Sequence, residues 1–393
     1  MDNILKTRSA ISDEYKWDLS LIYRSIEDFE NDYELTSSLI NEFSKLKDTM
    51  MNSANDLYEV LEHDKKINIL LDKLYMYAHL NKDSDTTNQA YQALYGKVHN
   101  LMTNYSEISS FIIPTLLEYD YEKIEKFYID NPKLKEYSFV FENIYRKKKH
   151  ILSENEERII SSLSQTIGFP EDVYDMFTNA ELKFDTIKDE YGNDVALTDS
   201  NFSIFIKSKD RRVRRDAFNA LYDGYSKYKN TISLMLANDV KANTAISKIR
   251  KYNSALESSL FSDNIDINVY NNLISTVEDN LNVLYKYLDL KKKILKLDEL
   301  HLYDVYVSLL NDSNNKQYSF DEAKSLVKNA LSVLGDDYSK VLDKAFSEGW
   351  IDIYPNVGKV SGAYSSGSYS TNPYILLNYQ GELTDVSTLA HEL

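Results

Sequence analysis

Apolar residues recur at helical spacing over most of the chain. In segment 57–80 they follow the i, i+3, i+4, i+7 pattern of a helix that buries one face. Comparable patterns extend over 25–119, over 209–252 and from about 320 to 348. We therefore expect long helices, with an antiparallel helical bundle in 25–119. The apolar positions of 57–80 are Leu57, Val60, Leu61, Ile67, Leu70, Leu71, Leu74 and Tyr75.

The hydrophobic period changes from helical to alternating in two places. Residues 182–199 alternate around the sequence Tyr-Gly-Asn-Asp, which predicts a β-hairpin. The stretches 362–365 and 374–379 predict two short strands, joined by a loop rich in Ser, Gly, Asn and Pro. A helix is expected to follow these strands, with Thr384 or Asp385 as its N-cap.

Glycine and proline are scarce, at 10 and 5 residues in a chain of 393, which favours long uninterrupted helices. Gly168 and Pro170 lie close together, so we expect them to end one helix before a short one begins. The predicted fold class is therefore mainly α. It is a large multi-helix body with a β-hairpin near 182–199 and a small sheet near 360–380.

Charge and composition exclude several classes of function. The net charge of −17 disfavours nucleic acid and anionic lipid as partners, because phosphate groups repel an acidic surface. The basic runs 145–150 and 207–216 are better explained as solvated faces and salt bridges. No stretch approaches 18 apolar residues, so no membrane span is expected. The absence of cysteine rules out disulfides and thiolate chemistry, and fits a cytoplasmic protein.

The candidate chemistry lies at His391 and Glu392. The sequence has six histidines, and we interpret His63, His79 and His99, together with His150, as structural or solvent-facing. His391 is followed directly by Glu392 on a predicted helix, as in the H-E-x-x-H motif of zinc peptidases. There, two histidines on one helix face bind Zn²⁺, and the glutamate activates a water whose pKa the metal lowers to about 7.

Residues 350–393, which contain GKVSGAYS, PYILLNY and TLAHEL, closely resemble oligoendopeptidase F, a zinc metallopeptidase related to thimet oligopeptidase. These three blocks together are specific, and the resemblance runs in order through nearly the whole chain. Its other segments are 17–23, 149–163, 211–225, 251–265 and 300–307.

The resemblance implies a mostly helical body that encloses a deep channel, which admits short oligopeptides and excludes folded proteins. It implies three regions: an N-terminal helical region at 1–110, a helical segment with the hairpin at 111–200, and the first part of the catalytic domain at 201–393. The oligomeric state stays open.

By position in the motif, the resemblance makes His391 the first ligand of one zinc ion and Glu392 the general base. Four residues, placed by strand logic as well as by resemblance, would line the peptide-binding cleft: Gly362, Ala363, Tyr364 and Ser365.

The family motif continues beyond Leu393 with Gly-His, so the remaining ligands are expected outside this sequence. A polypeptide that ended at Leu393 would bind zinc weakly and would not hydrolyse peptides. The alternative function is a non-catalytic helical scaffold or peptide-binding module. A helical interaction protein unrelated to peptidases is a third possibility, against which the ordered block at 350–393 argues.

Overall fold

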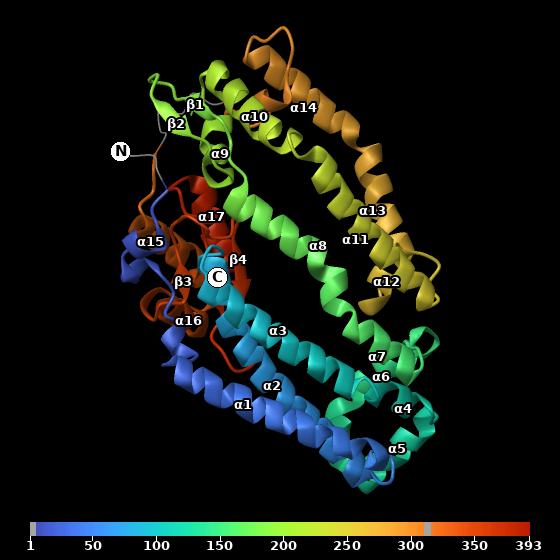
Figure 1. The fold of residues 1–393 in the computed structure, drawn as a ribbon. Helices are drawn as coiled ribbons and strands as arrows, with labels where there is room; N and C mark the ends of the chain where they lie inside the picture. The colour runs from blue at the N-terminus through green and yellow to red at the C-terminus, as the bar shows by residue number, and fades with distance from the viewer. Residues whose placement is uncertain (1–4, 310–315) are drawn as a thin grey trace.

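The computed structural model describes residues 5–309 and 316–393, which form a mainly helical body with two small sheets (Figure 1). The fold class predicted from the sequence is therefore confirmed. None of the described helices combines the length and apolar character needed to cross a bilayer. The helices are α1 (Ile26–Phe43), α2 (Ala54–Ser84), α3 (Gln89–Ser109), α4 (Ile112–Leu117), α5 (Tyr121–Asp130), α6 (Ser138–Arg146), α7 (Glu154–Ser162), α8 (Ser164–Met176), α9 (Asp199–Ile206), α10 (Arg211–Ser226), α11 (Lys229–Ile249), α12 (Ala255–Ser262), α13 (Ile267–Asp279), α14 (Leu281–Ile294), α15 (Phe320–Leu331), α16 (Asp336–Ser347) and α17 (Leu383–Glu392).

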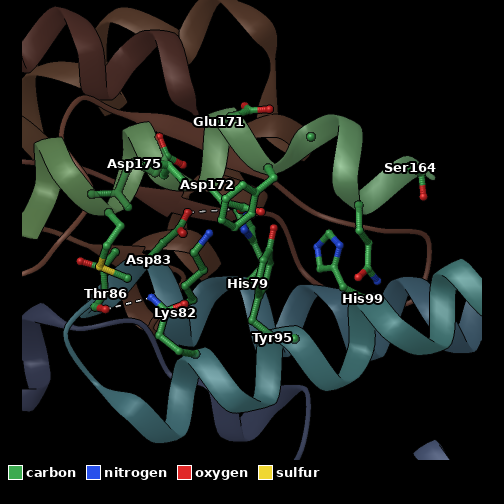
Figure 2. Close-up of a pocket in the computed structure, with 18 of the residues that line it drawn as sticks. His79, Lys82, Asp83, Thr86, Tyr95, His99, Ser164, Glu171, Asp172 and Asp175 are labelled. Atoms are coloured by element: carbon green, nitrogen blue, oxygen red, sulfur yellow. Dashed lines mark hydrogen bonds and ion pairs between the residues drawn. The ribbon is translucent and has the colours of Figure 1, made fainter. Parts of the chain in front are cut away.

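Helix α8 runs through Gly168 and Pro170, so the prediction that these residues end a helix was wrong. A proline inside a helix removes one backbone donor, and the other hydrogen bonds of the helix can persist around it. Helix α8 contacts α11 and α3, although none of its residues is fully buried. In Figure 2, α8 carries Ser164, Glu171, Asp172 and Asp175 along one wall of a cavity.

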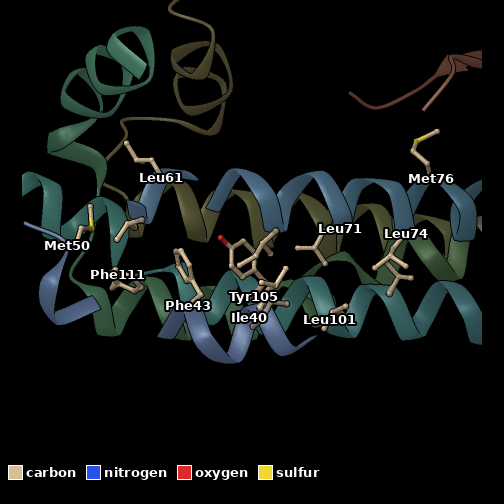
Figure 3. Packing of buried hydrophobic residues seen from close by; sticks show 14 of the residues in the cluster. Ile40, Phe43, Met50, Leu61, Leu71, Leu74, Met76, Leu101, Tyr105 and Phe111 are labelled. Atoms are coloured by element: carbon tan, nitrogen blue, oxygen red, sulfur yellow. The ribbon is translucent and has the colours of Figure 1, made fainter. Parts of the chain in front are cut away.

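Helices α1, α2 and α3 build the main hydrophobic core (Figure 3). Ile40 and Phe43 of α1 and Leu74 of α2 are completely buried between these helices, beside Leu71 and Leu101. The apolar stripe predicted over 57–80 faces this core, as the helical period required. Local hydrophobic periodicity therefore predicted the part of the fold that depends on helix–helix packing.

The larger sheet has the strand order β3-β5-β4, formed by β3 (Ile351–Asp352), β4 (Tyr364–Ser366) and β5 (Tyr374–Leu376). Strand β3 runs parallel to β5, and β4 runs antiparallel to it. Two of these strands were predicted, whereas β3 was missed. The side chains of β5 alternate between two cores, because Leu376 packs in the main core and Ile375 packs against α15 and α17.

The smaller sheet is the predicted hairpin, in which β1 (Thr186–Lys188) pairs antiparallel with β2 (Asp194–Ala196). The Asp189 carboxylate accepts backbone hydrogen bonds from Tyr191 and Asn193, both at 2.8 Å, and so fixes the turn. On the sheet face, Ile187 and Val195 are buried against α10.

The start of α17 differs from the prediction of Thr384 or Asp385 as N-cap. The N-cap is Glu382, and Asp385 is the third residue of the helix. The Asp385 carboxylate accepts hydrogen bonds from the backbone amides of Gln380 and Glu382, both at 2.9 Å. This capping box satisfies the amides just before the helix and fixes where α17 leaves the sheet.

A buried charge cluster joins the N-terminal arm to the sheet. Asp352 of β3 is completely buried, and both of its oxygens pair with the Arg8 guanidinium. Lys359, also completely buried, lies 2.6 Å from Asp352 and donates to the carbonyl oxygens of Tyr354 at 2.8 Å and Leu377 at 2.5 Å. Burial alone would raise the pKa of Asp352, but the charges of Lys359 and Arg8 hold it below its ordinary value.

We expect Lys359→Met to lower the free energy of unfolding by about 3–5 kcal/mol, because it leaves buried Asp352 and several carbonyls without a donor. The matched control is Lys340→Met, since Lys340 pairs with Asp337 on the exposed surface and should contribute less than about 1 kcal/mol. Urea unfolding followed by circular dichroism measures both. Equal losses for the two variants would contradict a dominant role for the buried cluster.

Candidate functional site

His391 and Glu392 lie at the C-terminal end of α17, which packs against α15. Leu389 is completely buried on the inner face of this helix, and Val386 lies beside it. His391 is exposed and Glu392 is half-buried on the outer face. Neither side chain makes a hydrogen bond or ion pair with another described residue, so both are free to act on a metal or substrate.

The described residues bring together no group of three or more His, Asp or Glu side chains that could hold a metal ion. Among the described residues, His391 is therefore not part of a complete three-ligand metal site. Its exposed imidazole and the neighbouring Glu392 carboxylate fit the first ligand and the base of a zinc-peptidase helix. Two further protein ligands would be needed to complete such a site.

Of the predicted cleft residues, Tyr364 and Ser365 lie in strand β4, and Gly362 and Ala363 lie just before it. The side-chain amide of Asn378, which lies just after β5, donates to the carbonyl oxygens of Val360 and Gly362, both at 2.9 Å. Among the described strands, β4 pairs only with β5 and forms one edge of the sheet. An edge strand has unpaired backbone groups with which an extended peptide can pair.

Tyr364 points from β4 towards the C-terminal end of α2. Its hydroxyl donates to the Asp83 carboxylate at 2.9 Å, and its ring stacks on His79 with centroids 5.9 Å apart. His79 also lies 3.3 Å from the same Asp83 oxygen. Burial raises the pKa of Asp83, and the opposing effects of His79 and Tyr364 are smaller.

Backbone contacts fix the rest of this junction between α2 and the loop before β4. The Val360 amide donates to the Asp83 carbonyl at 3.0 Å, and the Thr86 amide donates to the Gly358 carbonyl at 2.7 Å. Gly358 has φ of +78°, and a Cβ there would lie 2.6 Å from the Asp85 carboxylate. Only glycine fits this close approach. These contacts hold the end of α2 and the loop before β4 in a fixed relative position, although the two segments lie about 275 residues apart in the sequence.

A cavity of about 1180 Å³ adjoins this junction (Figure 2). Its walls come from α2 and α3 on one side and from α8 on the other, with contributions from α11 and Val360. His79 and His99, interpreted from the sequence as structural or solvent-facing, both line it. Burial lowers the pKa of each of these histidines, so both favour the neutral form.

The sequence did not indicate Lys82 or Asp83, although both line the cavity. They are nearly buried charged residues at the end of an amphipathic helix, with 8% and 5% of their surface exposed. From the sequence alone they resemble an ordinary charged helix end. The only available signal was that Met76, Ala78 and Leu80 extend the apolar pattern almost to these positions.

Two family models match the chain. Residues 204–393 match Peptidase family M3, and residues 116–184 match Oligopeptidase F. The chain belongs to peptidase family M3. The resemblance to oligoendopeptidase F that residues 350–393 carry is thereby confirmed at the level of the family.

Two curated relatives illustrate this membership of family M3. Oligopeptidase PepF of Bacillus subtilis (strain 168) is 38% identical over 390 residues, which are 99% of this chain and 58% of the relative. An oligoendopeptidase F homolog of Borreliella burgdorferi is 37% identical over 393 residues, covering 98% of this chain and 64% of the relative. The chain thus spans about three fifths of the length of these relatives.

The crystal structure of oligoendopeptidase-F from Enterococcus faecium has the same fold. It superposes with a TM-score of 0.72 at 30% sequence identity, over 81% of this chain and 60% of that chain. The PZ peptidase A structure has a TM-score of 0.69 at 14% identity and supports the fold alone.

We expect Tyr364→Phe to lower the free energy of unfolding by about 1–3 kcal/mol near neutral pH, because it removes a donor from buried Asp83. The Tyr364 hydrogen bond stabilises the ionised form of Asp83 and lowers its pKa. The loss should therefore be largest above the folded pKa of Asp83 and should shrink as the pH falls and Asp83 becomes protonated.

Urea unfolding at a series of pH values measures this effect. The matched control is Tyr369→Phe, since Tyr369 is 92% exposed and should change stability by less than about 0.5 kcal/mol. A Tyr364→Phe loss that stays constant from neutral to acid pH would contradict the role given to the Asp83 carboxylate.

Proposed function

We propose that this chain carries the first part of the catalytic centre of a zinc-dependent endopeptidase that hydrolyses short oligopeptides. The observation that carries the proposal is the position of exposed His391 and half-buried Glu392 side by side on α17, after a sheet with a free edge strand, in a chain of peptidase family M3. The relatives named oligopeptidase and oligoendopeptidase support the same substrate class.

In this proposal His391 donates one imidazole nitrogen to the metal. Bound zinc supplies Lewis acidity, which polarises the scissile carbonyl and makes water acidic enough to lose a proton near neutral pH. Glu392, as general base, accepts the proton from the attacking water. The two side chains are adjacent on one helix, as the H-E-x-x-H arrangement requires, so His391 would hold the metal and Glu392 would serve as the base beside it.

Strand β4 is proposed to hold the peptide. Gly362, Ala363, Tyr364 and Ser365 present a free sheet edge, along which an extended peptide can form backbone hydrogen bonds. Recognition through the peptide backbone places few demands on side chains, so peptides of varied sequence can bind. The junction with Asp83 keeps this edge in a fixed position relative to α2.

We further propose that the remaining zinc ligands lie outside residues 1–393, since the described residues gather no metal-holding group of three. By itself this 393-residue chain is then expected to bind zinc weakly and to be inactive. Reading about forty codons of the encoding DNA past Leu393 tests this directly: Gly-His, followed by a Glu in a helical pattern, supports the proposal. A stop codon directly after Leu393 would contradict the proposal.

A non-catalytic peptide-binding module is the second candidate function. The large cavity and the free edge of β4 favour it, because both can hold a peptide without cleaving it. The two candidates differ in whether bound peptides are cleaved.

We expect Glu392→Gln to abolish hydrolysis, with a loss of at least about 10²-fold in kcat, while zinc binding is kept, because the amide cannot accept the proton of water. His391→Ala should lose zinc and activity together. The assay uses a quenched fluorescent peptide and the full translation product of the gene, with metal content measured in parallel. His301→Ala is a matched control, since His301 is an exposed histidine on a different element.

Full activity of Glu392→Gln would exclude Glu392 as the base. Binding of intact peptide without cleavage by the zinc-loaded protein would favour the non-catalytic candidate instead.

A further inference from the structure

Lys82 is a nearly buried cation that faces the cavity without a hydrogen-bonding partner. Only 8% of its surface is exposed, and its ammonium lies 4.1 Å from the centroid of the Tyr95 ring. It forms no hydrogen bond or ion pair with another described residue. The neighbouring Asp83 carboxylate accepts a hydrogen bond from Tyr364 and lies 3.3 Å from His79. A buried ammonium in this state gains stability from an anionic group that enters the cavity.

The opposite wall of the cavity is acidic. Asp172 and Asp175 of α8 line it, and neither carboxylate makes a hydrogen bond or ion pair within the described chain (Figure 2). The charge of Asp172 acts across the cavity on His99 of α3. Burial raises the pKa of Asp175, the charge of Lys82 opposes this rise, and the neighbouring acids add to it. Asp172 is exposed and Asp175 is half-buried, and a cationic group that enters between them is attracted by both charges.

Opposite charges on opposite walls match a ligand that carries both charges. A free peptide has an ammonium at one end and a carboxylate at the other. The cavity volume of about 1180 Å³ exceeds that of most small-molecule sites, so a short peptide fits within it. The rings of Tyr75 and Tyr95 add apolar and cation-binding surface beside the charged groups.

We propose that this cavity binds short peptides by both free ends, with the carboxylate at Lys82 and the ammonium at Asp172 and Asp175. The inference rests on the proposed function, because it specifies which peptides the protein takes. It adds a preference for free peptide ends that backbone pairing with β4 does not supply. The link is direct, since Asp83 lines the cavity and also holds Tyr364 of β4.

The test uses tetra-alanine in four forms: both ends free, N-acetylated, C-amidated, and blocked at both ends. Isothermal titration on the 393-residue chain, with a chelator present to prevent hydrolysis, gives each Kd. We expect the free form to bind tightest. Each single block should weaken binding about tenfold, which corresponds to one lost charge-assisted hydrogen bond.

Variants assign each end to its wall. Lys82→Met should abolish the difference between free and amidated peptides and keep the effect of acetylation, whereas Lys82→Arg should keep both. The double variant Asp172→Asn, Asp175→Asn should abolish the effect of acetylation and keep that of amidation. Lys66→Met is the matched control, because Lys66 is exposed on the same helix and lies outside the cavity.

Equal affinity for all four peptides, or no detectable binding, would overturn the inference. So would a Lys82→Met variant that is folded by circular dichroism and still discriminates against the amide. These results are separable from the catalytic proposal. Hydrolysis by the full translation product with equal binding of all four peptides would remove only the preference for free ends. End-dependent binding without hydrolysis would remove only the catalytic role.

Discussion

The buried carboxylate of Asp352 is the constraint on which the arrangement of the C-terminal region depends. It pairs with Arg8 of the N-terminal arm and with Lys359 of the nearby loop that leads to β4, so it joins the distant arm to the sheet. Charges so deeply buried add little net stability, because desolvation offsets their attraction, but their geometry admits few alternatives. Through Lys359, the cluster also holds the Tyr354 and Leu377 carbonyls and thereby sets where the sheet begins and ends.

From this fixed sheet, the loop 356–364 runs to α2, where Asp83 and Thr86 hold it by side-chain and backbone hydrogen bonds. Helix α2 therefore has two roles along its length. Its first part is a core helix whose apolar stripe packs against α1 and α3. In its last turn, Asp83 makes hydrogen bonds to Tyr364 and Val360 and thereby supports the free edge at β4. A helix that is rigidly packed at one end is a suitable base for positioning functional groups at the other.

The sequence predicted features that depend on local periodicity and missed those that depend on distant contacts. The stripe of α2, the hairpin around Asp189 and the strand at Tyr374 all have short-range signals. Strand β3 has only two residues, and its partner β5 lies 24 positions away, so no local pattern marks it. Pro170 was interpreted as a helix end from its backbone chemistry, whereas α8 continues through it and contacts α11 and α3. His391 and Glu392 were found by motif, but the burial of Lys82 follows from the fold alone.

Asp83 lines the cavity and also accepts a hydrogen bond from Tyr364 of β4, so it joins the cavity to the sheet edge. The two proposed peptide contacts can therefore act on the same peptide. The strand edge offers backbone pairing, which is indifferent to peptide sequence, and the charged walls offer recognition of ends, which is also indifferent to sequence. In the proposed modes of binding neither contact distinguishes side chains, so together they are expected to select for short, unfolded peptides rather than for particular residues. Folded proteins rarely present free termini and an unpaired extended segment close together. If the proposed binding of both peptide ends holds, the charges on the two walls discriminate between peptides and proteins, in addition to any limit set by the size of the cavity.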